Sequence, residues 1–199
     1  MSDKYHIFEP TVSSRATIKG RTKLRIGAFT VVEDYVLLDT GLSLKSSITL
    51  GKRCKIKQGA VLRTYDGNIE IGDRVSVGEY SVIAGHGNVM IGDCTVIAGH
   101  CSISSSNHIF VAEELIRFQG ETAQGIVIGR SVWIGAGAII LDGVIIGDGS
   151  VIGAGSLVSH SLPPNVICFG APCRVVKQRE LVSAVESISE EYENEICRG

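Results

Sequence analysis

The chain has 199 residues, a formal net charge of -2, 44% hydrophobic residues, 24 Gly and 4 Pro. This length suits one domain with a continuous core, and the composition suits a β-rich solenoid better than a disordered or collagen-like chain. The balanced charge and the lack of a long basic run argue against nucleic acid as a main partner, because that binding depends on Lys and Arg at phosphate groups.

Residues 1–11 carry no periodic pattern and are predicted to form a lead-in. They contain no apolar run fit for a signal peptide, and the chain has no stretch of about 18 uninterrupted apolar residues that could span a bilayer. The six cysteines form neither CxxC pairs nor a short secreted framework, which is typical of reduced thiols. We therefore expect a cytoplasmic protein without an integral membrane segment.

From Val12 onward, aliphatic residues six apart organise the chain. After a weak first set of Val12, Ile18 and Leu24, the expected rungs are Ile26, Val32, Leu38, Leu44, Leu50, Ile56 and Leu62, then Ile71, Val77, Ile83 and Val89, then Ile91, Ile97 and Ile103, and finally Ile128, Ile134, Ile140, Ile146, Ile152 and Val158. Residues six apart share no face of a helix, whereas an extended chain keeps them on one side. The pattern therefore predicts strands.

Glycines next to many of these aliphatic residues predict bends, because glycine takes backbone angles that other residues avoid. Three short strands and three bends make one coil of a triangular solenoid, in which the aliphatic residues lie along the axis. Roughly twenty rungs at three per coil predict about seven coils. The predicted fold is an all-β, single-stranded parallel β-helix over residues 12–174.

Three interruptions of the stride identify one edge of the predicted prism. They follow Leu62, Ile83 and Ile103, where the chain inserts TYDGN, HGN and the long segment 104–125. Counting three rungs per coil puts all three insertions at the same vertex. Insertions in a solenoid usually form loops on its binding side, so we expect the chemistry of the protein along this edge.

His108, in the motif SSSNHIF of the longest insertion, is the candidate for proton transfer. An imidazole titrates near neutrality and can take a proton from an attacking group, although a solvated loop histidine is the alternative. His86 and Asn88 come from the insertion one coil earlier, and Asp66 and Asn68 from the one before that. We expect these residues either to line a cleft beneath His108 or to be exposed turn residues.

The C-terminal part changes pattern after Val158. The proline pair and the Gly-Ala-Pro of SHSLPPNVICFGAP are expected to end the repeat. Apolar residues then recur at three- or four-residue spacing beside a run of glutamates: Leu181, Val185, Ile188 and Tyr192. This spacing predicts a short amphipathic helix over 175–196, in a tail of residues 175–199, that covers the last coil or crosses to another subunit.

The segment IVIGRSVWIGAGAIILDGVIIGDGSVIGAGSLVSHSLPPNVICFGAPCRVVKQR closely resembles the C-terminal signature of hexapeptide-repeat acyltransferases. The segment resembles in particular the branch of bacterial sugar and cell-surface polysaccharide O-acetyltransferases, which includes galactoside and maltose acetyltransferases, and the similarity covers about residues 24–179. The resemblance implies a left-handed β-helix, against the usual right-handed crossover. It also implies a homotrimer with active sites between adjacent prisms, and acetyl-CoA as co-substrate without a metal.

The resemblance also implies roles for individual residues. SSSNHIF, Gln119-Gly120 and Val132-Trp133 stand where the family has its loop histidine and the elements after it, so His108 is implied to be the general base. The residues implied to lie beside acetyl-CoA are Trp133, Gly135, Gly153 and Ala154, with Arg174, Lys177 or Arg179 near its phosphates.

Two departures from the family pattern leave the acceptor and the partner of the imidazole open. Asn107 stands where many members have Asp, and no N-terminal helical segment like that of maltose and serine acetyltransferases is present. Asn107 therefore joins Asp66, His86 and Asn88 as a candidate for binding a saccharide acceptor. In the expected reaction, His108 takes the proton of an acceptor hydroxyl as its oxygen attacks the thioester carbonyl, while backbone N–H groups stabilise the oxyanion.

Three alternatives remain open from the sequence. An N-acetyltransferase acting on an amino sugar would use the same base as an O-acetyltransferase. A zinc hydrolyase like the γ-class carbonic anhydrases would need three histidines on one metal, and the spacing of His86, His100 and His108 does not match that family. A catalytically silent β-helix would serve as a scaffold.

Overall fold

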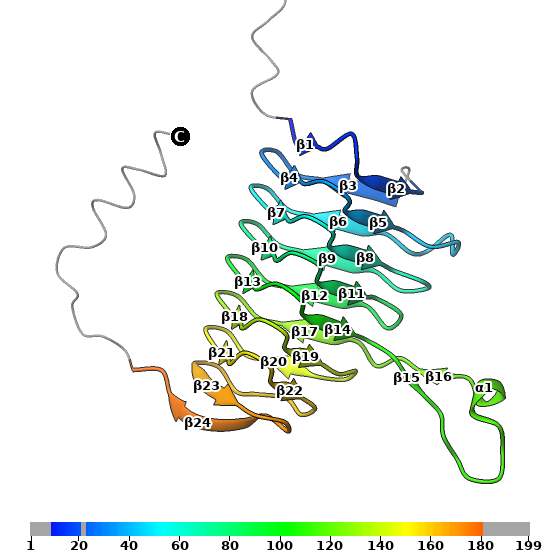
Figure 1. Ribbon diagram of the computed structural model, residues 1–199, viewed down its shortest axis with the longest axis vertical. Helices are drawn as coiled ribbons and strands as arrows, with labels where there is room; N and C mark the ends of the chain where they lie inside the picture. Colours follow the sequence, from blue (N-terminus) through cyan, green and yellow to red (C-terminus); the bar gives the residue numbers. More distant parts are fainter. Residues whose placement is uncertain (1–8, 21–22, 181–199) are drawn as a thin grey trace, which may run out of the picture.

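The computed structural model describes residues 9–20 and 23–180, and it shows short parallel strands stacked into a triangular solenoid of about seven turns (Figure 1). This architecture is consistent with the left-handed β-helix that the resemblance implies. The chain visits three faces in turn, and each face is a sheet of parallel strands from successive coils, to which one antiparallel strand is added at the C-terminal end of the first face. The predicted all-β solenoid is therefore confirmed.

The first face consists of β1 (Thr11–Val12), β4 (Val31–Val32), β7 (Lys55–Ile56), β10 (Ser76–Val77), β13 (Val96–Ile97), β18 (Trp133–Ile134), β21 (Val151–Ile152), β23 (Val166–Phe169) and β24 (Arg174–Gln178). The second consists of β2 (Thr17–Lys19), β5 (Leu37–Asp39), β8 (Val61–Arg63), β11 (Val82–Ala84), β14 (Ser102–Ser104), β19 (Ile139–Ile140) and β22 (Leu157–Val158). The third consists of β3 (Leu24–Ile26), β6 (Ile48–Leu50), β9 (Ile69–Ile71), β12 (Val89–Ile91), β17 (Ile126–Ile128) and β20 (Ile145–Ile146).

The core is a column of aliphatic side chains along the axis, as the stride of six predicts. Ile134, Ile140 and Ile146, one from each face of the same coil, are at most 1% exposed. On the third face β6, β9, β12 and β17 each turn two side chains inward; in β9, for example, Ile69 and Ile71 are buried while Glu70 between them is exposed. This alternation follows from the pleat of a strand.

The glycines that follow the aliphatic residues at the turns from the third face to the first have a physical role. A Cβ on Gly72 would lie only 2.3 Å from Oδ1 of Asp93 in the next coil. That same oxygen accepts a hydrogen bond of 2.9 Å from the backbone N–H of Asp73. At Gly51, Gly72 and Gly129 glycine is required because the aspartate of the following coil folds over it and braces the turn.

One expected rung, Leu44, is wrong. Its side chain is 95% exposed, and it lies in the connection 40–47 between β5 and β6. Leu38 and Leu50 are true rungs, but the connection between them inserts enough residues to preserve the stride by coincidence. Counting alone cannot separate two rungs from one rung and an insertion.

The C-terminal end differs from the prediction in two ways. The repeat does not stop at the proline pair, because β23 pairs in parallel with β21 beyond it. Residues 175–178, predicted to begin a helix, belong to β24, which pairs antiparallel with β23. Val175 and Val176 favour a strand, and the edge of β23 offers backbone groups that need partners. The rest of the predicted helix and residues 1–8 of the lead-in lie outside the described residues.

Across residues 9–20 and 23–180, no helix is long and apolar enough to cross a membrane.

Candidate functional site

The predicted insertions do share one vertex, which we call the loop vertex. β8, β11 and β14 lie next to one another on the second face, and the connections that follow them, 64–68, 85–88 and 105–125, all lead to the third face. The connection 40–47 after β5 lies at the same vertex. The loop vertex therefore carries insertions from four successive coils.

The longest insertion forms an arm that projects from the prism (Figure 1). Its base is a short antiparallel pair of β15 (Asn107–His108) and β16 (Glu121–Thr122). His108 lies directly opposite Glu121, and Asn107 lies opposite Thr122. Side chains directly opposite one another point to the same side of such a pair, and successive residues alternate sides. The base of the arm therefore has one His-Glu face and one Asn-Thr face.

Gln119 explains why a Gln-Gly pair follows the histidine in this chain. It ends α1 (Ile116–Gln119), and its Oε1 accepts a hydrogen bond of 2.7 Å from the backbone N–H of Val111. Its Nε2 donates to the carbonyls of Val111 and Glu114 at 2.9 and 2.8 Å. Gly120 then adopts a positive φ of 82° and accepts a hydrogen bond from the N–H of Ile109. These bonds hold the arm in shape and so position His108.

His108 is an accessible imidazole beside a carboxylate. Its side chain is 62% exposed, and its Nε2 lies 3.8 Å from Oε1 of Glu121. The other carboxylate oxygen, Oε2, lies 3.7 Å from Nε2 of His86, in the insertion one coil earlier. One carboxylate thus stands between two imidazoles.

His86 is fixed by the coil before it. Its ring stacks on Tyr65 with the centroids 3.7 Å apart and the planes 15° from parallel. The guanidinium of Arg63 lies 5.5 Å from the centroid of Tyr65 and forms an ion pair of 3.2 Å with Asp39. A hydrogen bond with Tyr65 raises the pKa of the Arg63 guanidinium, and the negative charge of Asp39 raises it further. The loop vertex therefore carries a continuous row of contacting polar and aromatic side chains.

The structure does not bring all the expected cleft residues beneath His108. Asp66 lines a cavity of ≈ 710 Å³ with Tyr65, Arg63 and Lys19, toward the N-terminal end of the loop vertex. The side-chain oxygen of Asn88 accepts hydrogen bonds from the backbone N–H and the Nδ2 of Asn68, at 2.8 and 3.2 Å. Of the expected residues, only His86 reaches the face of His108, through Glu121.

Asn107 lines a different hollow on the other side of the arm base. This cavity of ≈ 260 Å³ also contains Thr122, Gln124, Asp142 and Ser159. The carboxylate of Asp142 accepts hydrogen bonds of 2.9 to 3.0 Å from the backbone N–H groups of residues 124 and 125. It thereby fixes the point at which the arm rejoins the prism.

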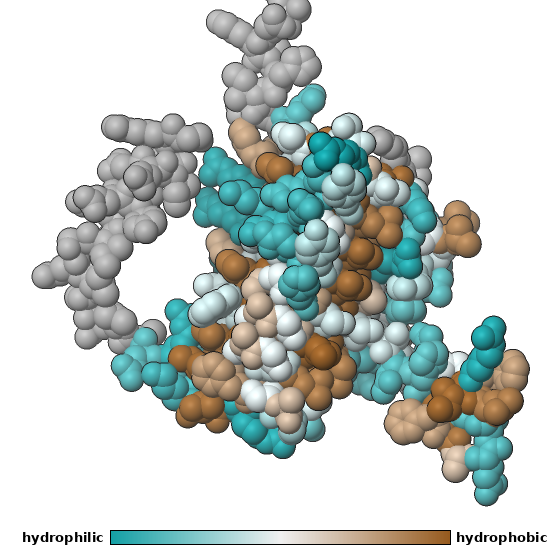
Figure 2. All heavy atoms as spheres, in the orientation of Figure 1, coloured by the Kyte–Doolittle hydropathy of each residue, from teal (hydrophilic) through white to brown (hydrophobic). Residues whose placement is uncertain are grey.

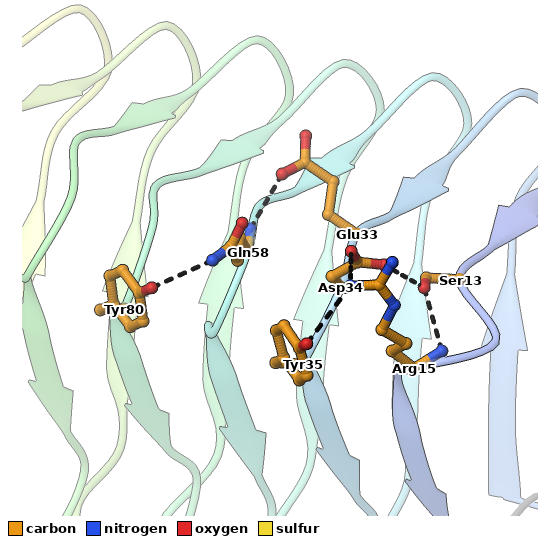
Figure 3. Close-up of polar contacts among 7 residues, drawn as sticks. All are labelled: Ser13, Arg15, Glu33, Asp34, Tyr35, Gln58 and Tyr80. Carbon is orange, nitrogen blue, oxygen red and sulfur yellow. Dashed lines mark hydrogen bonds and ion pairs between the residues drawn. The ribbon is translucent and has the colours of Figure 1, made fainter.

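The vertex between the first and second faces, which we call the column vertex, has a different character. From the turn after β4 onward, one position in each turn has a positive φ, and it is occupied in successive coils by Tyr35, Gly59, Tyr80, His100, Gly137 and Gly155. In the early coils polar side chains link neighbouring turns (Figure 3): Arg15 donates to the hydroxyl of Tyr35 at 3.2 Å, and Gln58 donates to that of Tyr80 at 3.1 Å. Tyr80 in turn stacks on His100 at 5.5 Å.

This column of side chains ends at the last two coils. At Gly137 and Gly155, apart from the glycine and its two chain neighbours, no described residue has an atom within 4 Å of the place that a Cβ would occupy. The column vertex is therefore filled by side chains as far as His100 and is bare beyond it. A bare backbone surface is what a ligand held by backbone groups requires.

The residues expected beside acetyl-CoA lie around this bare surface. Trp133 on β18 is 55% exposed on the outside of the first face, next to Val151 on β21. A Cβ on Gly135 would lie 2.5 Å from the backbone nitrogen of Ala154, so the two turns are in close contact. Gly153 has no room for a Cβ because the ring of Phe169 packs against it.

The three candidate cations at the C-terminal end differ in the hydrogen bonds that they make. Nη1 of Arg179 donates a hydrogen bond of 2.6 Å to the carbonyl of Gly149 and so braces the last coil. Nη1 of Arg174 bonds to the carbonyl of Cys173 at 3.3 Å, and Arg174 and Lys177 are both exposed on β24. Arg174 and Lys177 therefore fit a role toward an anionic ligand better than Arg179.

His108 and the bare surface lie at different vertices of the same prism. The arm leaves the loop vertex, between the second and third faces, whereas Gly137 and Gly155 lie at the column vertex. A single chain therefore does not bring the expected base and the expected acetyl-CoA surface together.

Exposed apolar side chains gather on the arm, which is brown in its middle and teal at its ends in Figure 2. They are Phe110, Val111, Leu115, Ile116 and Phe118. An apolar patch on a projecting segment indicates contact with another surface.

Within the described ranges 9–20 and 23–180, no three His, Cys, Asp or Glu side chains converge as metal ligands.

Two features of the site were not predicted from the sequence. Glu121 follows the Gln-Gly pair, but only the register of β15 and β16 shows that it faces His108. Tyr65 belongs to TYDGN, and only the stacking of coils shows that it holds His86. The sequence does contain the change from Tyr80 and His100 to Gly137 and Gly155, but the repeat shows it only when the positive-φ position in each turn is known.

Comparison with known proteins supports the resemblance. Residues 125–160 match the family described as bacterial transferase hexapeptide (six repeats). The chain is 30% identical over 157 residues to the probable acetyltransferase Rv3034c of Mycobacterium tuberculosis, covering 76% of this chain and 52% of that protein. It is 41% identical over 53 residues to the galactoside O-acetyltransferase of Escherichia coli, covering 27% of this chain and 26% of that one.

The chain spans about half the length of the curated relatives that it matches over the longest stretches. Among solved structures, a mutant of AntD, an N-acyltransferase from Bacillus cereus in complex with dTDP-4-amino-4,6-dideoxyglucose and coenzyme A, has a TM-score of 0.64 at 22% identity. This likeness covers 96% of this chain and 91% of that one and shows a shared fold. The resemblance to hexapeptide-repeat acyltransferases is thus confirmed.

Proposed function

We propose that the chain is an acetyl-CoA-dependent acyltransferase that acetylates a sugar hydroxyl, in the modification of a saccharide or a cell-surface polysaccharide. The observation that carries the proposal is the exposed imidazole of His108, held by a braced arm beside the carboxylate of Glu121. Its relatives in sequence are named acetyltransferases, and residues 125–160 carry the hexapeptide repeat of bacterial transferases.

In the proposed reaction His108 is the general base. It takes the proton of the acceptor hydroxyl as that oxygen attacks the thioester carbonyl of acetyl-CoA. When the carbon–sulfur bond breaks, the imidazolium returns the proton to the leaving thiolate. The acetyl group passes directly to the acceptor, so no covalent acyl-enzyme forms. Polar groups at the loop vertex, among them His86, Asn88, Asp66 and Asn107, are the proposed contacts for a saccharide.

For acetyl-CoA, we propose the bare part of the column vertex. Gly137 and Gly155 leave the backbone open there, Trp133 lies outward on the adjacent first face, and Gly135, Gly153 and Ala154 form the tightly stacked turns. Arg174 and Lys177 are the proposed contacts for its phosphates, because Arg179 is engaged by Gly149.

We propose a homotrimer, and the separation of the two vertices supports contact between copies of the chain. His108 of one copy can meet acetyl-CoA on the column vertex only if that vertex belongs to a neighbouring copy. The apolar side chains of the arm, which lie exposed in the single chain, supply a surface for this contact. Light scattering coupled to size-exclusion chromatography measures the mass directly, and a monomer at assay concentrations would contradict this arrangement.

The test of function is release of free CoA from acetyl-CoA in the presence of a panel of sugars and amino sugars. We expect turnover with at least one sugar, and loss of at least about 100-fold in His108→Ala, the lower range for general base catalysis. His160→Ala is the matched control, since this exposed histidine contacts Ser159 in the final turn and lies outside the arm. Turnover of His108→Ala within tenfold of the wild type would remove His108 as the base.

The panel also separates the two kinds of acceptor. Products formed only with amino sugars, and blocked when the amine is already acetylated, would identify an N-acetyltransferase with the same base. Absence of CoA release and of acetyl-CoA binding across the panel would favour a scaffold over an enzyme.

A further inference from the structure

We propose that Glu121 is the positioning residue for His108, and that His86 in turn holds Glu121 without neutralising it. The inference rests on the proposed function, in which His108 is the base. It assigns the partner of the imidazole to a residue that the sequence pattern did not single out, on the strand opposite the histidine.

The register of the arm base places the two groups together. His108 and Glu121 are directly opposite in the antiparallel pair of β15 and β16, so their side chains leave the same face. Oε1 of Glu121 is 3.8 Å from Nε2 of His108, and Oε2 is 3.7 Å from Nε2 of His86. One carboxylate oxygen of Glu121 therefore faces the ring of His108, and the other faces the ring of His86. Catalytic hydrogen bonds are often long in ligand-free structures and tighten when the substrate binds.

Asn107, which stands at the usual place of an aspartate, cannot take this role. It alternates with His108 along β15 and pairs with Thr122 on the opposite face of the arm base. There it lines the cavity that contains Asp142 and Ser159. The carboxylate that the family pattern lacks at position 107 is thus supplied across the strand pair.

His86 and His108 are not equivalent. The ring of His86 stacks on Tyr65, and its Nδ1 is buried without a hydrogen-bond partner among the described residues. Protonation of both ring nitrogens would bury an unpaired N–H group, which is unfavourable. The favoured tautomer has its hydrogen on Nε2, which faces Glu121. In this form His86 turns its Nε2–H toward the carboxylate, 3.7 Å away, and leaves the negative charge of Glu121 available to His108.

The consequence for the reaction concerns the imidazolium. With Nε2–H of His108 directed at Glu121, Nδ1 is the nitrogen that accepts the proton from the acceptor. The positive charge that forms on the ring then lies beside the carboxylate of Glu121. The proton passes from the acceptor to His108 and from His108 to the leaving thiolate, so Glu121 neither gains nor loses a proton.

The first test is Glu121→Gln, which keeps the shape of the side chain and removes its charge. We expect kcat to fall at least fivefold while KM for acetyl-CoA and for the acceptor each change less than twofold. Glu114→Gln is the matched control, because it makes the same substitution on the same arm away from both histidines. Equal activity of the wild type and Glu121→Gln, or a loss confined to KM, would overturn the positioning role.

The second variant, His86→Phe, keeps an aromatic ring against Tyr65 and removes the Nε2–H donor. We expect kcat to fall at least twofold in this variant and no further loss when His86→Phe is combined with Glu121→Gln. Additive losses in the double variant would show that His86 acts independently of Glu121.

A third readout does not depend on turnover. The groups that face His108 are Glu121 and, across it, His86, with Tyr65 behind His86. NMR of the ring nitrogens, labelled with 15N, reports which nitrogen of each histidine carries a hydrogen. We expect the 15N signals of His108 to move in Glu121→Gln and to stay in place in Glu114→Gln; unchanged signals in Glu121→Gln would overturn the inference. If the wild type transfers no acetyl group, the proposed function fails, and these signals still decide whether Glu121 acts on His108.

Discussion

Ile139 and Ile140 are neighbours on β19 that should respond in opposite ways to the same substitution. Ile140 points into the axis, is 0% exposed and pairs with Ile103 and Val158 in the adjacent coils. Ile139 points outward and is 43% exposed. We expect Ile140→Asp to prevent folding to a soluble protein, and Ile139→Asp to leave the fold intact.

The magnitude follows from what the axis loses. Ile140→Asp removes a fully buried side chain, which contributes about 1.5–3 kcal/mol. It also places a carboxylate where no described polar group can pair with it, at an effective cost of several kcal/mol. Together these terms approach the whole stability of a typical domain, about 5–15 kcal/mol. Ile140→Ala, which leaves only a cavity, should cost about 2–5 kcal/mol, and Ile139→Ala less than about 1 kcal/mol.

The assay combines soluble yield, far-UV circular dichroism and urea denaturation of the four variants. The two alanine variants give the free energies of unfolding, and the two aspartate variants give the yield. A soluble, folded Ile140→Asp, or equal destabilisation by Ile139→Ala and Ile140→Ala, would refute the register in which every sixth residue faces the axis.

Two further predictions concern the surface. Gly137→Tyr should raise KM for acetyl-CoA at least tenfold while circular dichroism stays unchanged, because Tyr35 and Tyr80 adopt the same positive φ in earlier coils; an unchanged KM would contradict the assigned surface. Burial raises the pKa of Cys54 and Cys101, and raises that of Cys168 to about 12. Near neutral pH, Ellman's reagent should therefore modify exposed Cys94 rapidly and these three only after denaturation; Cys94→Ser should lose one fast equivalent.

The repeat was predictable because each coil is encoded locally. An aliphatic residue at every sixth position and a glycine at the bends describe a strand and a turn without reference to the rest of the chain. The vertex of the insertions followed by counting, since the faces recur in order. Counting was wrong at Leu44, where an insertion matched the stride. The pattern was also wrong for residues 175–178, where the open edge of β23 decided in favour of a strand.

The sequence by itself therefore determined the solenoid, its axis, the loop vertex and His108 as the candidate base. The tertiary structure alone decided which groups meet at that vertex. Glu121 reaches His108 through the register of two strands separated by the whole arm, and Tyr65 reaches His86 through the stacking of successive coils. The tertiary structure also showed that the bare surface at Gly137 and Gly155 lies at the column vertex, whereas the arm leaves the loop vertex. The physical reason is that backbone pairing follows a short repeating pattern, whereas the meeting of side chains depends on the lengths of insertions and the order in which coils stack.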